Sequence, residues 1–145
     1  ENQMKLLTKP IRERLLANGR IRKQLDEAGE ADPDFVPVVK LFTPDANATW
    51  LLIEIDPDDP DIAFGLCDLG HGFPELGSVS LSELEAVRGK LGLPVERDRH
   101  FYPEFTIAVY ARAAWTAQHI VEDCSALERA AVEVDQAKQH AGGVS

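Results

Sequence analysis

The sequence predicts an α+β domain in which a small antiparallel sheet of three to five strands packs with helices. Three segments rich in β-branched and apolar residues, 36–42, 49–55 and 62–68, are joined by connections of about six residues. Such connections suit antiparallel neighbours and are too short for a parallel crossover. A capping motif and a long apolar stripe at helical spacing then predict helices in the second half of the chain.

The first predicted element is an N-terminal helix. Its cap is expected at Thr8, whose hydroxyl can accept a backbone N–H of the first turn. The dipeptide formed by Asn18 and Gly19 predicts a helix stop or a turn. A second, mostly polar helical stretch is then predicted over 20–28, before the three strands.

A helix after the strands has the clearest local signal in the chain. Ser80 and Glu83 have the spacing of a capping box, in which each side chain can satisfy the backbone N–H of the other residue. Apolar residues follow at helical spacing, and Gly92 provides a stop. The pattern predicts a helix over 81–91, preceded by a short fourth strand over 77–80.

The last third of the chain has apolar residues at steps of three, four and seven, and no glycine or proline lies between 104 and 141. This pattern predicts a single long helix over 104–139. Residues 106–110 have an alternative as a strand, since threonine, isoleucine, valine and tyrosine favour strands.

The charge of the chain restricts its partners. Twenty-five acidic residues against 15 basic ones give a formal net charge of −10. This balance repels phosphate, which argues against direct nucleic-acid binding and against binding to an anionic membrane. No segment approaches the roughly 20 apolar residues of a membrane helix, and the N-terminal residues do not resemble a secretory signal. With Cys67 and Cys124 far apart in apolar surroundings, we expect a cytoplasmic protein with two buried, reduced thiols.

Five segments carry a resemblance to a known family. They are 4–9, 37–45, 49–54, 64–70 and, as the strongest, GSVSLSELEAVRGKLGLPVERD over 77–98. Together they resemble a bacterial domain of unknown function that is often carried on plasmids and other mobile elements.

That resemblance covers about residues 4–102. It implies an α+β domain over 1–102, followed by a C-terminal helical extension over 103–145 that packs on the domain or on a partner. It implies an accessory role on a mobile element, with no catalytic residues and no cofactor.

Three functional hypotheses follow. The first is a non-enzymatic accessory or protein-interaction protein of a plasmid or mobile element. The second is an acidic protein that mimics nucleic acid and inhibits a host defence protein, because closely spaced carboxylates can imitate phosphates. The third is a small metal-dependent hydrolase.

The candidate interaction surface is a thin apolar stripe on the predicted C-terminal helix. A helix of about 35 residues is about 50 Å long, which exceeds the body of a domain whose radius of gyration is about 13 Å. Part of the stripe would then be uncovered, which predicts a homodimer or a complex with a protein partner. The alternative is that the helix bends back and the stripe is ordinary core. The stripe consists of Ile120, Cys124, Leu127, Ala131 and Val134.

A candidate anion-binding loop precedes that helix. Arg97, Arg99 and His100 lie next to aromatic residues, and guanidinium groups suit phosphate or carboxylate. The alternative is a surface cluster of salt bridges.

Sites for metal or nucleophilic chemistry have weaker support. Cys67 with His71, and His119 with Cys124, are zinc-ligand residue types at poor spacing, so no metal site is predicted. Cys67 with His71 or His100 is an alternative pair of nucleophile and base, which no motif supports.

Acidic side chains raise two further readings. The acidic loop over 56–61 is either a solvated hairpin tip or a weak site for calcium or magnesium. Glu54 and Asp68 are carboxylates that strand pairing could bring face to face.

Overall fold

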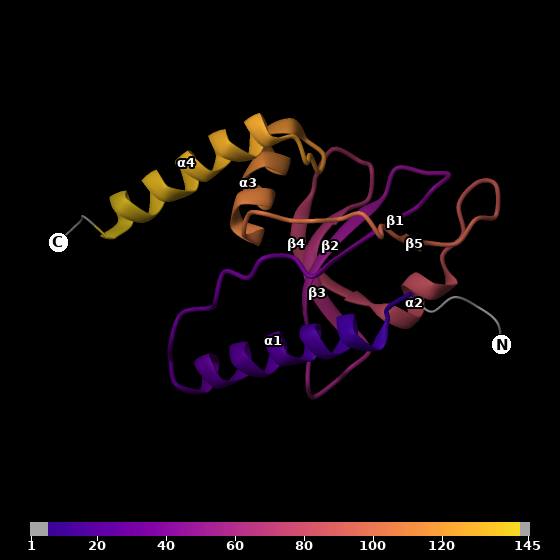
Figure 1. The fold of residues 1–145 in the computed structure, drawn as a ribbon, viewed down its shortest axis with the longest axis horizontal. Coiled ribbons are helices and arrows are strands. Elements are labelled where there is room, and N and C mark those ends of the chain that lie inside the picture. Colours follow the sequence, from indigo (N-terminus) through magenta and orange to yellow (C-terminus); the bar gives the residue numbers. More distant parts are fainter. Residues whose placement is uncertain (1–5, 143–145) are drawn as a thin grey trace.

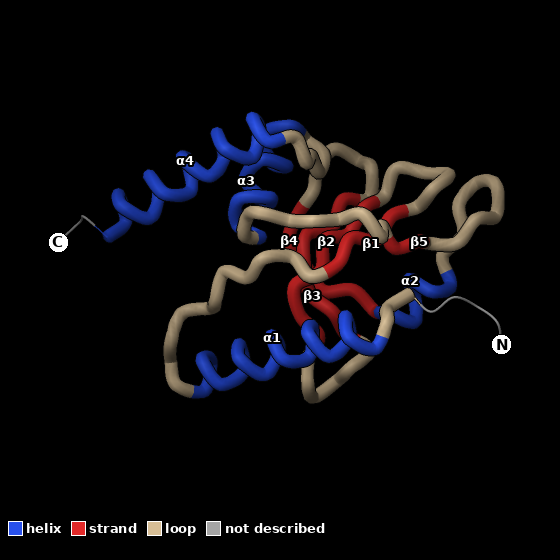
Figure 2. The backbone as a smooth tube through the Cα atoms, viewed as in Figure 1, coloured by secondary structure: helices blue, strands red, loops and turns tan. Residues whose placement is uncertain are grey.

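The computed structural model describes residues 6–142, and within this range a sheet lies between two layers of helices (Figure 1). The elements are α1 (Lys9–Glu27), β1 (Val39–Phe42), β2 (Thr49–Ile55), β3 (Ile62–Asp68), β4 (Glu75–Ser80), α2 (Leu81–Ala86), β5 (Glu96–Arg97), α3 (Ile107–Ala117) and α4 (Cys124–Gly142). The sheet has the order β4-β3-β2-β1-β5, and every neighbouring pair is antiparallel. Helices α1 and α2 lie on one face, and α3 and α4 on the other (Figure 2). The predicted α+β class is confirmed.

The strands follow the prediction most closely in the middle of the sheet. β2 and β3 have the predicted bounds. β1 begins only at Val39, because Pro37 has no N–H for a ladder, although the N–H of Val38 already donates to the carbonyl of Leu52 (2.9 Å). β4 begins earlier than predicted, at Glu75. β5 was not predicted, because two residues give no periodicity.

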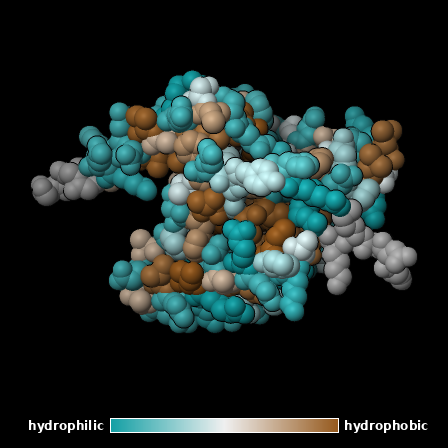
Figure 3. Space-filling view, in the orientation of Figure 1, coloured by the Kyte–Doolittle hydropathy of each residue, from teal (hydrophilic) through white to brown (hydrophobic). Residues whose placement is uncertain are grey.

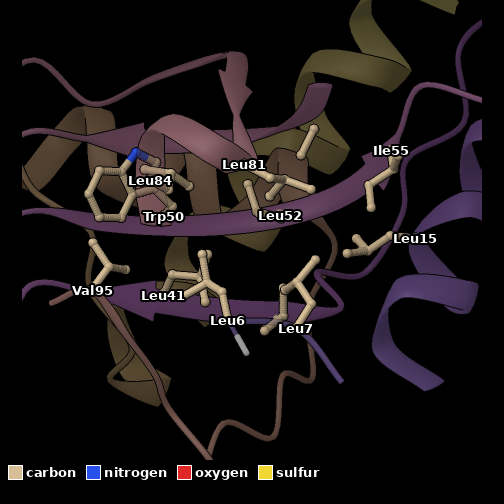
Figure 4. Packing of buried hydrophobic residues seen from close by; sticks show 12 residues of the cluster. Leu6, Leu7, Leu15, Leu41, Trp50, Leu52, Ile55, Leu81, Leu84 and Val95 are labelled. Atoms are coloured by element: carbon tan, nitrogen blue, oxygen red, sulfur yellow. The ribbon is translucent and has the colours of Figure 1, made fainter. Parts of the chain in front are cut away.

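One hydrophobic core lies between the sheet and helices α1 and α2. Leu84 of α2 lies beside the ring of Trp50, and Leu15 of α1 approaches Ile55 at the end of β2 (Figure 4). None of these four side chains is more than 5% exposed. Burial of each such side chain contributes about 1.5–3 kcal/mol, so the chain's own helices close this face.

Helix α1 does not stop at Asn18 and Gly19, so the predicted break there is wrong. Gly19 is buried against β2, where an added Cβ would lie 1.9 Å from the carbonyl oxygen of Ile55. Asn18 donates its side-chain amide to the carbonyl of Ile53 (2.8 Å). The two residues therefore bring the helix close to the sheet. The predicted cap at Thr8 is confirmed.

Helix α2 is shorter than the predicted helix over 81–91. The N–H groups of Leu91 and Leu93 donate to the carboxylate of Asp45, at 2.6 and 3.3 Å. A Cβ at Gly89 would lie 1.6 Å from the same carboxylate, so the loop passes close to it. Asp45, which is distant in the sequence, thus accepts the N–H of Leu91 that a helix over 81–91 would have used.

The cap of α2 is confirmed in part. The hydroxyl oxygen of Ser80 accepts the N–H of Glu83 (3.2 Å), as predicted. The carboxylate of Asp61 accepts the hydroxyl of Ser80 (2.5 Å) and the N–H of Ser82 (2.9 Å). These hydrogen bonds lower the pKa of Asp61. The cap therefore joins the β2–β3 region to α2.

The predicted single helix over 104–139 is wrong, because the chain turns between α3 and α4. Gln118 ends α3 with a φ of 67°, in the left-handed region. The N–H of Ile120 then donates to the carboxylate of Asp68 at the end of β3 (2.9 Å). The strand alternative for 106–110 is also wrong, since α3 begins at Ile107.

A second core fills the other face of the sheet. Leu127 of α4 and Tyr110 of α3, 2% and 4% exposed, belong to the same buried cluster as Leu51 and Leu66 of the sheet. Figure 3 shows hydrophobic side chains along the middle of its view and hydrophilic ones along the upper and lower margins. Among the described helices, none has the length and apolar content that crossing a membrane requires.

Candidate functional site

The outer edge of β4 is open. β4 is the first strand of the sheet order, and within residues 6–142 it pairs only with β3. The N–H of Leu81 donates to the carbonyl of Asp61 (2.8 Å), so these two residues form a hydrogen-bonded pair next to the β3–β4 ladder. Because hydrogen-bonded and non-hydrogen-bonded pairs alternate in an antiparallel ladder, the backbone groups of Gly77 and Val79 point to β3. Those of Leu76 and Ser78 point away from the sheet.

An apolar groove lies beside this edge. It has a volume of about 400 Å³. Its lining residues come from β2, β3, β4 and the loop between β3 and β4: Trp50, Cys67, Leu69, His71, Phe73, Glu75, Leu76, Gly77, Ser78 and Val79. No atom lies within 4 Å of the position that a Cβ on Gly77 would occupy, so the absence of a side chain there leaves open space.

Exposed apolar side chains surround the groove. Phe73 is 82% exposed, Leu69 58% and Leu76 45%. Gly70 and Gly72 have φ values of 83° and 86°, which let the β3–β4 loop turn so that Phe73 lies in solvent. Grouped apolar side chains at an open strand edge are typical of an interaction surface. We call the open edge of β4 with this groove the β4 site.

The thiol of Cys67 in the groove is unsuited to nucleophilic catalysis. Burial, and secondarily the charge of Glu75, raises its pKa to about 11. The sulfur lies 3.8 Å from the carbonyl oxygens of Gly65 and Gly77. A thiol with this pKa is almost entirely protonated at neutral pH, and the thiolate is the reactive form. No hydrogen bond joins Cys67 to His71 in the described part of the chain.

A second, polar cavity of about 480 Å³ lies where the β1–β2 turn, the β3–β4 loop and the α3–α4 connection meet. Its buried carboxylate, Asp68, accepts the N–H groups of Gly70 and Ile120, both at 2.9 Å. His119 contacts the carbonyl of Ala117 through its Nδ1 (3.1 Å). These groups hold loops together, which is a structural role.

Lys40 also lines that cavity. Its amine pairs with Glu122 (2.5 Å) and Asp98 (3.4 Å). Burial opposes the charged form of Lys40, but these two carboxylates outweigh it and raise the pKa. The amine therefore connects β1 to the connection between α3 and α4 and to the segment after β5.

Two residues of the predicted anion loop, Arg97 and His100, form hydrogen bonds within the chain. Arg97 lies in β5 and donates to the carbonyl of Leu6 (2.8 Å). Asp98 accepts the N–H of exposed His100 (2.8 Å) and pairs with Lys40. These contacts join the segment 97–100 to Leu6 and to β1. Anion binding by Arg97, Arg99 and His100 stays a prediction.

The predicted interaction stripe lies at the junction of α4 with α3. Leu127 is buried in the second core, while Ile120, Ala131 and Val134 pack against it and are partly buried. Cys124 is exposed. Because α3 covers much of the stripe, its premise of one long uncovered helix no longer holds, and partner binding there stays a prediction.

The carboxylates singled out from the sequence have structural partners. Strand pairing places Asp68 opposite Thr49 and Glu54 opposite Phe64, so the two acids are not face to face. Glu54 pairs with Arg22 of α1. Burial raises the pKa of Glu54, against the opposing effect of Arg22.

The acidic loop over 56–61 is likewise engaged. Asp58 pairs with Lys23 (2.8 Å), and Asp56 accepts the N–H of Asp58 (2.9 Å). Within residues 6–142, no group of three or more histidine, cysteine, aspartate or glutamate side chains is arranged to hold a metal ion.

The β4 site was missed in the sequence. Its local signal in the sequence is the presence of Leu69 and Phe73 on either side of a glycine-rich turn. Apolar residues in a turn belong to no helical or strand pattern, so nothing indicated where these two side chains point. The open edge depends on strand order, which local patterns do not specify.

Comparison with known proteins identifies the family. The family described as protein of unknown function (DUF2958) matches residues 6–121, a range that includes the sheet, α1, α2 and α3. No curated protein and no solved structure matches the chain.

Proposed function

The chain belongs to the DUF2958 family of proteins of unknown function, and we propose that it is a non-enzymatic protein-interaction domain that binds its partner at the β4 site. The observation that carries the proposal is the exposure of Phe73 (82%) beside an apolar groove and an unpaired strand edge. An exposed phenylalanine forgoes about 1.5–3 kcal/mol of burial free energy. A partner that covers it recovers this free energy on binding.

The chemistry of the two cavities supports a binding role over catalysis. In the apolar groove, the thiol of Cys67 is held protonated. In the polar cavity, both oxygens of Asp68 accept backbone N–H groups and the amine of Lys40 pairs with two carboxylates. The charged groups that a hydrolase would use are engaged in holding the fold.

The setting of this interaction is a further part of the proposal. The resemblance of segment 77–98 to a domain carried on plasmids and mobile elements supports an accessory role for a bacterial mobile element, in the cytoplasm. Mimicry of nucleic acid has less support, because the carboxylates of Asp45, Asp61 and Asp68 accept hydrogen bonds from within the chain.

The test is photo-crosslinking in cells that produce the protein. A photoreactive phenylalanine analogue replaces Phe73 in one variant and Tyr102 in a matched control, since Tyr102 is 79% exposed and lies after β5 at the opposite edge of the sheet. We expect a discrete protein adduct from position 73 that position 102 does not give. Equal adduct patterns from the two positions would contradict binding at the β4 site.

A further inference from the structure

We infer that the partner adds an extended strand to β4, and that this strand carries apolar side chains toward the groove and basic side chains beside them. The inference rests on the proposed function and adds the binding mode and the chemistry of the partner segment.

The backbone of β4 is available over a short stretch. Leu76 and Ser78 point their N–H and C=O groups away from β3, and both residues are exposed. Pro74 has no N–H on one side of this stretch, and Ser80 is committed to capping α2 on the other. An added strand therefore meets a template of about five residues, and main-chain hydrogen bonds hold it there.

The groove favours apolar side chains on one face of that strand. Strand register aligns Trp50, Cys67 and Glu75 across the sheet. Gly77 lies two residues along β4 on the same face, with open space above it. A large apolar side chain from the added strand fits this space and covers the apolar lining of the groove.

The charge of the edge favours basic side chains in the partner. Glu75 is the one aspartate, glutamate, lysine or arginine among the described residues that line the groove. Glu75 on β4 and Glu83 in the first turn of α2 are exposed, and neither forms a salt bridge within the described part of the chain. Opposite charges across neighbouring strands stabilise pairing, and like charges weaken it.

A second copy of this chain fits the edge less well. Two copies bring together molecules with a formal net charge of −10 each, and each contributes the same acidic edge. Complementary charge therefore selects a different, basic segment over self-association.

The experiment selects peptides from a displayed library of random ten-residue sequences on the folded full chain. Ser78→Pro serves for counter-selection, because it removes an outward N–H without touching the bonds to β3. Ser78→Ala keeps that N–H and is the matched control. Circular dichroism of each variant checks that it is folded. We expect enriched peptides to carry apolar and basic residues two positions apart, so that both lie on the face toward the groove, and the dissociation constant to rise about tenfold in Ser78→Pro but not in Ser78→Ala.

A charge variant tests the chemistry of the partner separately. Glu75→Lys should weaken binding of the selected peptide several-fold, whereas Glu128→Lys, at an exposed glutamate of α4, should not. No enrichment, acidic or neutral consensus peptides, or equal loss in the two serine variants would overturn the inference. So would a dimer of the chain that Ser78→Pro dissociates. A position-73 adduct alongside any of these results would leave the proposed function standing without strand addition.

Discussion

The carboxylate of Asp68, buried at the end of β3, accepts the backbone N–H of Ile120, which is 52 residues away in the chain. Its other oxygen accepts the N–H of Gly70. One side chain thus fixes the start of the β3–β4 loop and the turn between α3 and α4. The β4 site depends on the contact with Gly70, because the loop that starts there carries Phe73.

Asp68→Ala should lower the free energy of unfolding by about 3 kcal/mol, because two N–H groups lose a charged acceptor. Asp68→Asn should lose less, since its amide oxygen can still accept one of them. Urea unfolding measures both variants. Hydrogen exchange at the amide of Ile120 should also become faster in Asp68→Ala. An unchanged unfolding midpoint would mean that Asp68 does not hold the turn.

Gly19→Ala should destabilise the protein, although alanine is the better helix former by about 1 kcal/mol. The new methyl group would lie 1.9 Å from the carbonyl oxygen of Ile55, so α1 must move away from β2. We expect a net loss of about 1–3 kcal/mol in thermal or urea unfolding. Arg20→Ala, at the exposed neighbouring position, is the control and should change stability by less than about 0.5 kcal/mol. A stabilised Gly19→Ala would show that the helix does not pack this closely.

Ser80→Ala should cost about 1 kcal/mol of unfolding free energy, because the N–H of Glu83 loses its cap. The comparison is Ser78→Ala on β4, which removes a hydroxyl that caps nothing. The midpoints of chemical denaturation are compared for the two variants. Equal midpoints would mean that Ser80 does not stabilise the protein as a cap.

Arg22→Ala should make the free energy of unfolding depend on pH, because Glu54 loses its cationic partner. Burial already raises the pKa of Glu54, and loss of Arg22 should raise it further. A raised folded-state pKa favours the protonated form, so stability is lost as pH rises from the ordinary carboxyl range through the raised value. We expect a loss of about 2 kcal/mol at pH 7, below the roughly 3–5 kcal/mol of a fully buried pair because the side chain of Arg22 is 28% exposed.

The loss in Arg22→Ala should shrink as pH falls. The control is the double variant Arg22→Ala/Glu54→Gln, in which no buried carboxylate remains and the deficit should be smaller and flat with pH. Unfolding curves at pH 5 and pH 7 make the comparison. Equal deficits of the single variant at both values would contradict the pairing.

The two cysteines should differ strongly in reaction with a thiol reagent. Cys124 is exposed, whereas Cys67 is half-buried with a pKa of about 11. At pH 8 that pKa leaves roughly one Cys67 thiol in a thousand ionised. Labelling of Cys124→Ser and Cys67→Ser should therefore show slow and fast kinetics respectively. Fast labelling in Cys124→Ser would mean that the groove holds an activated thiol.

Patterns local in sequence predicted the elements that local interactions determine. β2 and β3 are continuous apolar runs between turn residues, and the cap at Ser80 lies next to the helix that it starts. The errors in the helix bounds involve distant partners. Gly19 serves a contact with Ile55, Asp45 takes the N–H groups that would extend α2, and Asp68 holds the turn that divides the C-terminal helix.

The candidate site likewise depends on contacts between segments that are distant in the sequence. The stripe that includes Leu127 and Val134 was correctly predicted to be apolar. The turn that places α3 over it was not predicted, so the stripe was expected to be uncovered. The β4 site requires knowledge of which strand is at the edge and which side of it is open. Residues such as Phe73 and Leu76 carry no mark of this in the sequence.

Amide hydrogen exchange along β4, measured by NMR without and with a selected peptide, tests the central claim most directly. In the free protein the amides of Leu76 and Ser78 should exchange fast, and those of Gly77 and Val79 slowly, because only the latter two bond to β3. On binding, the amides of Leu76 and Ser78 should become protected. Protection of these two amides in the free protein, or protection elsewhere with both remaining fast on binding, would contradict strand addition at β4.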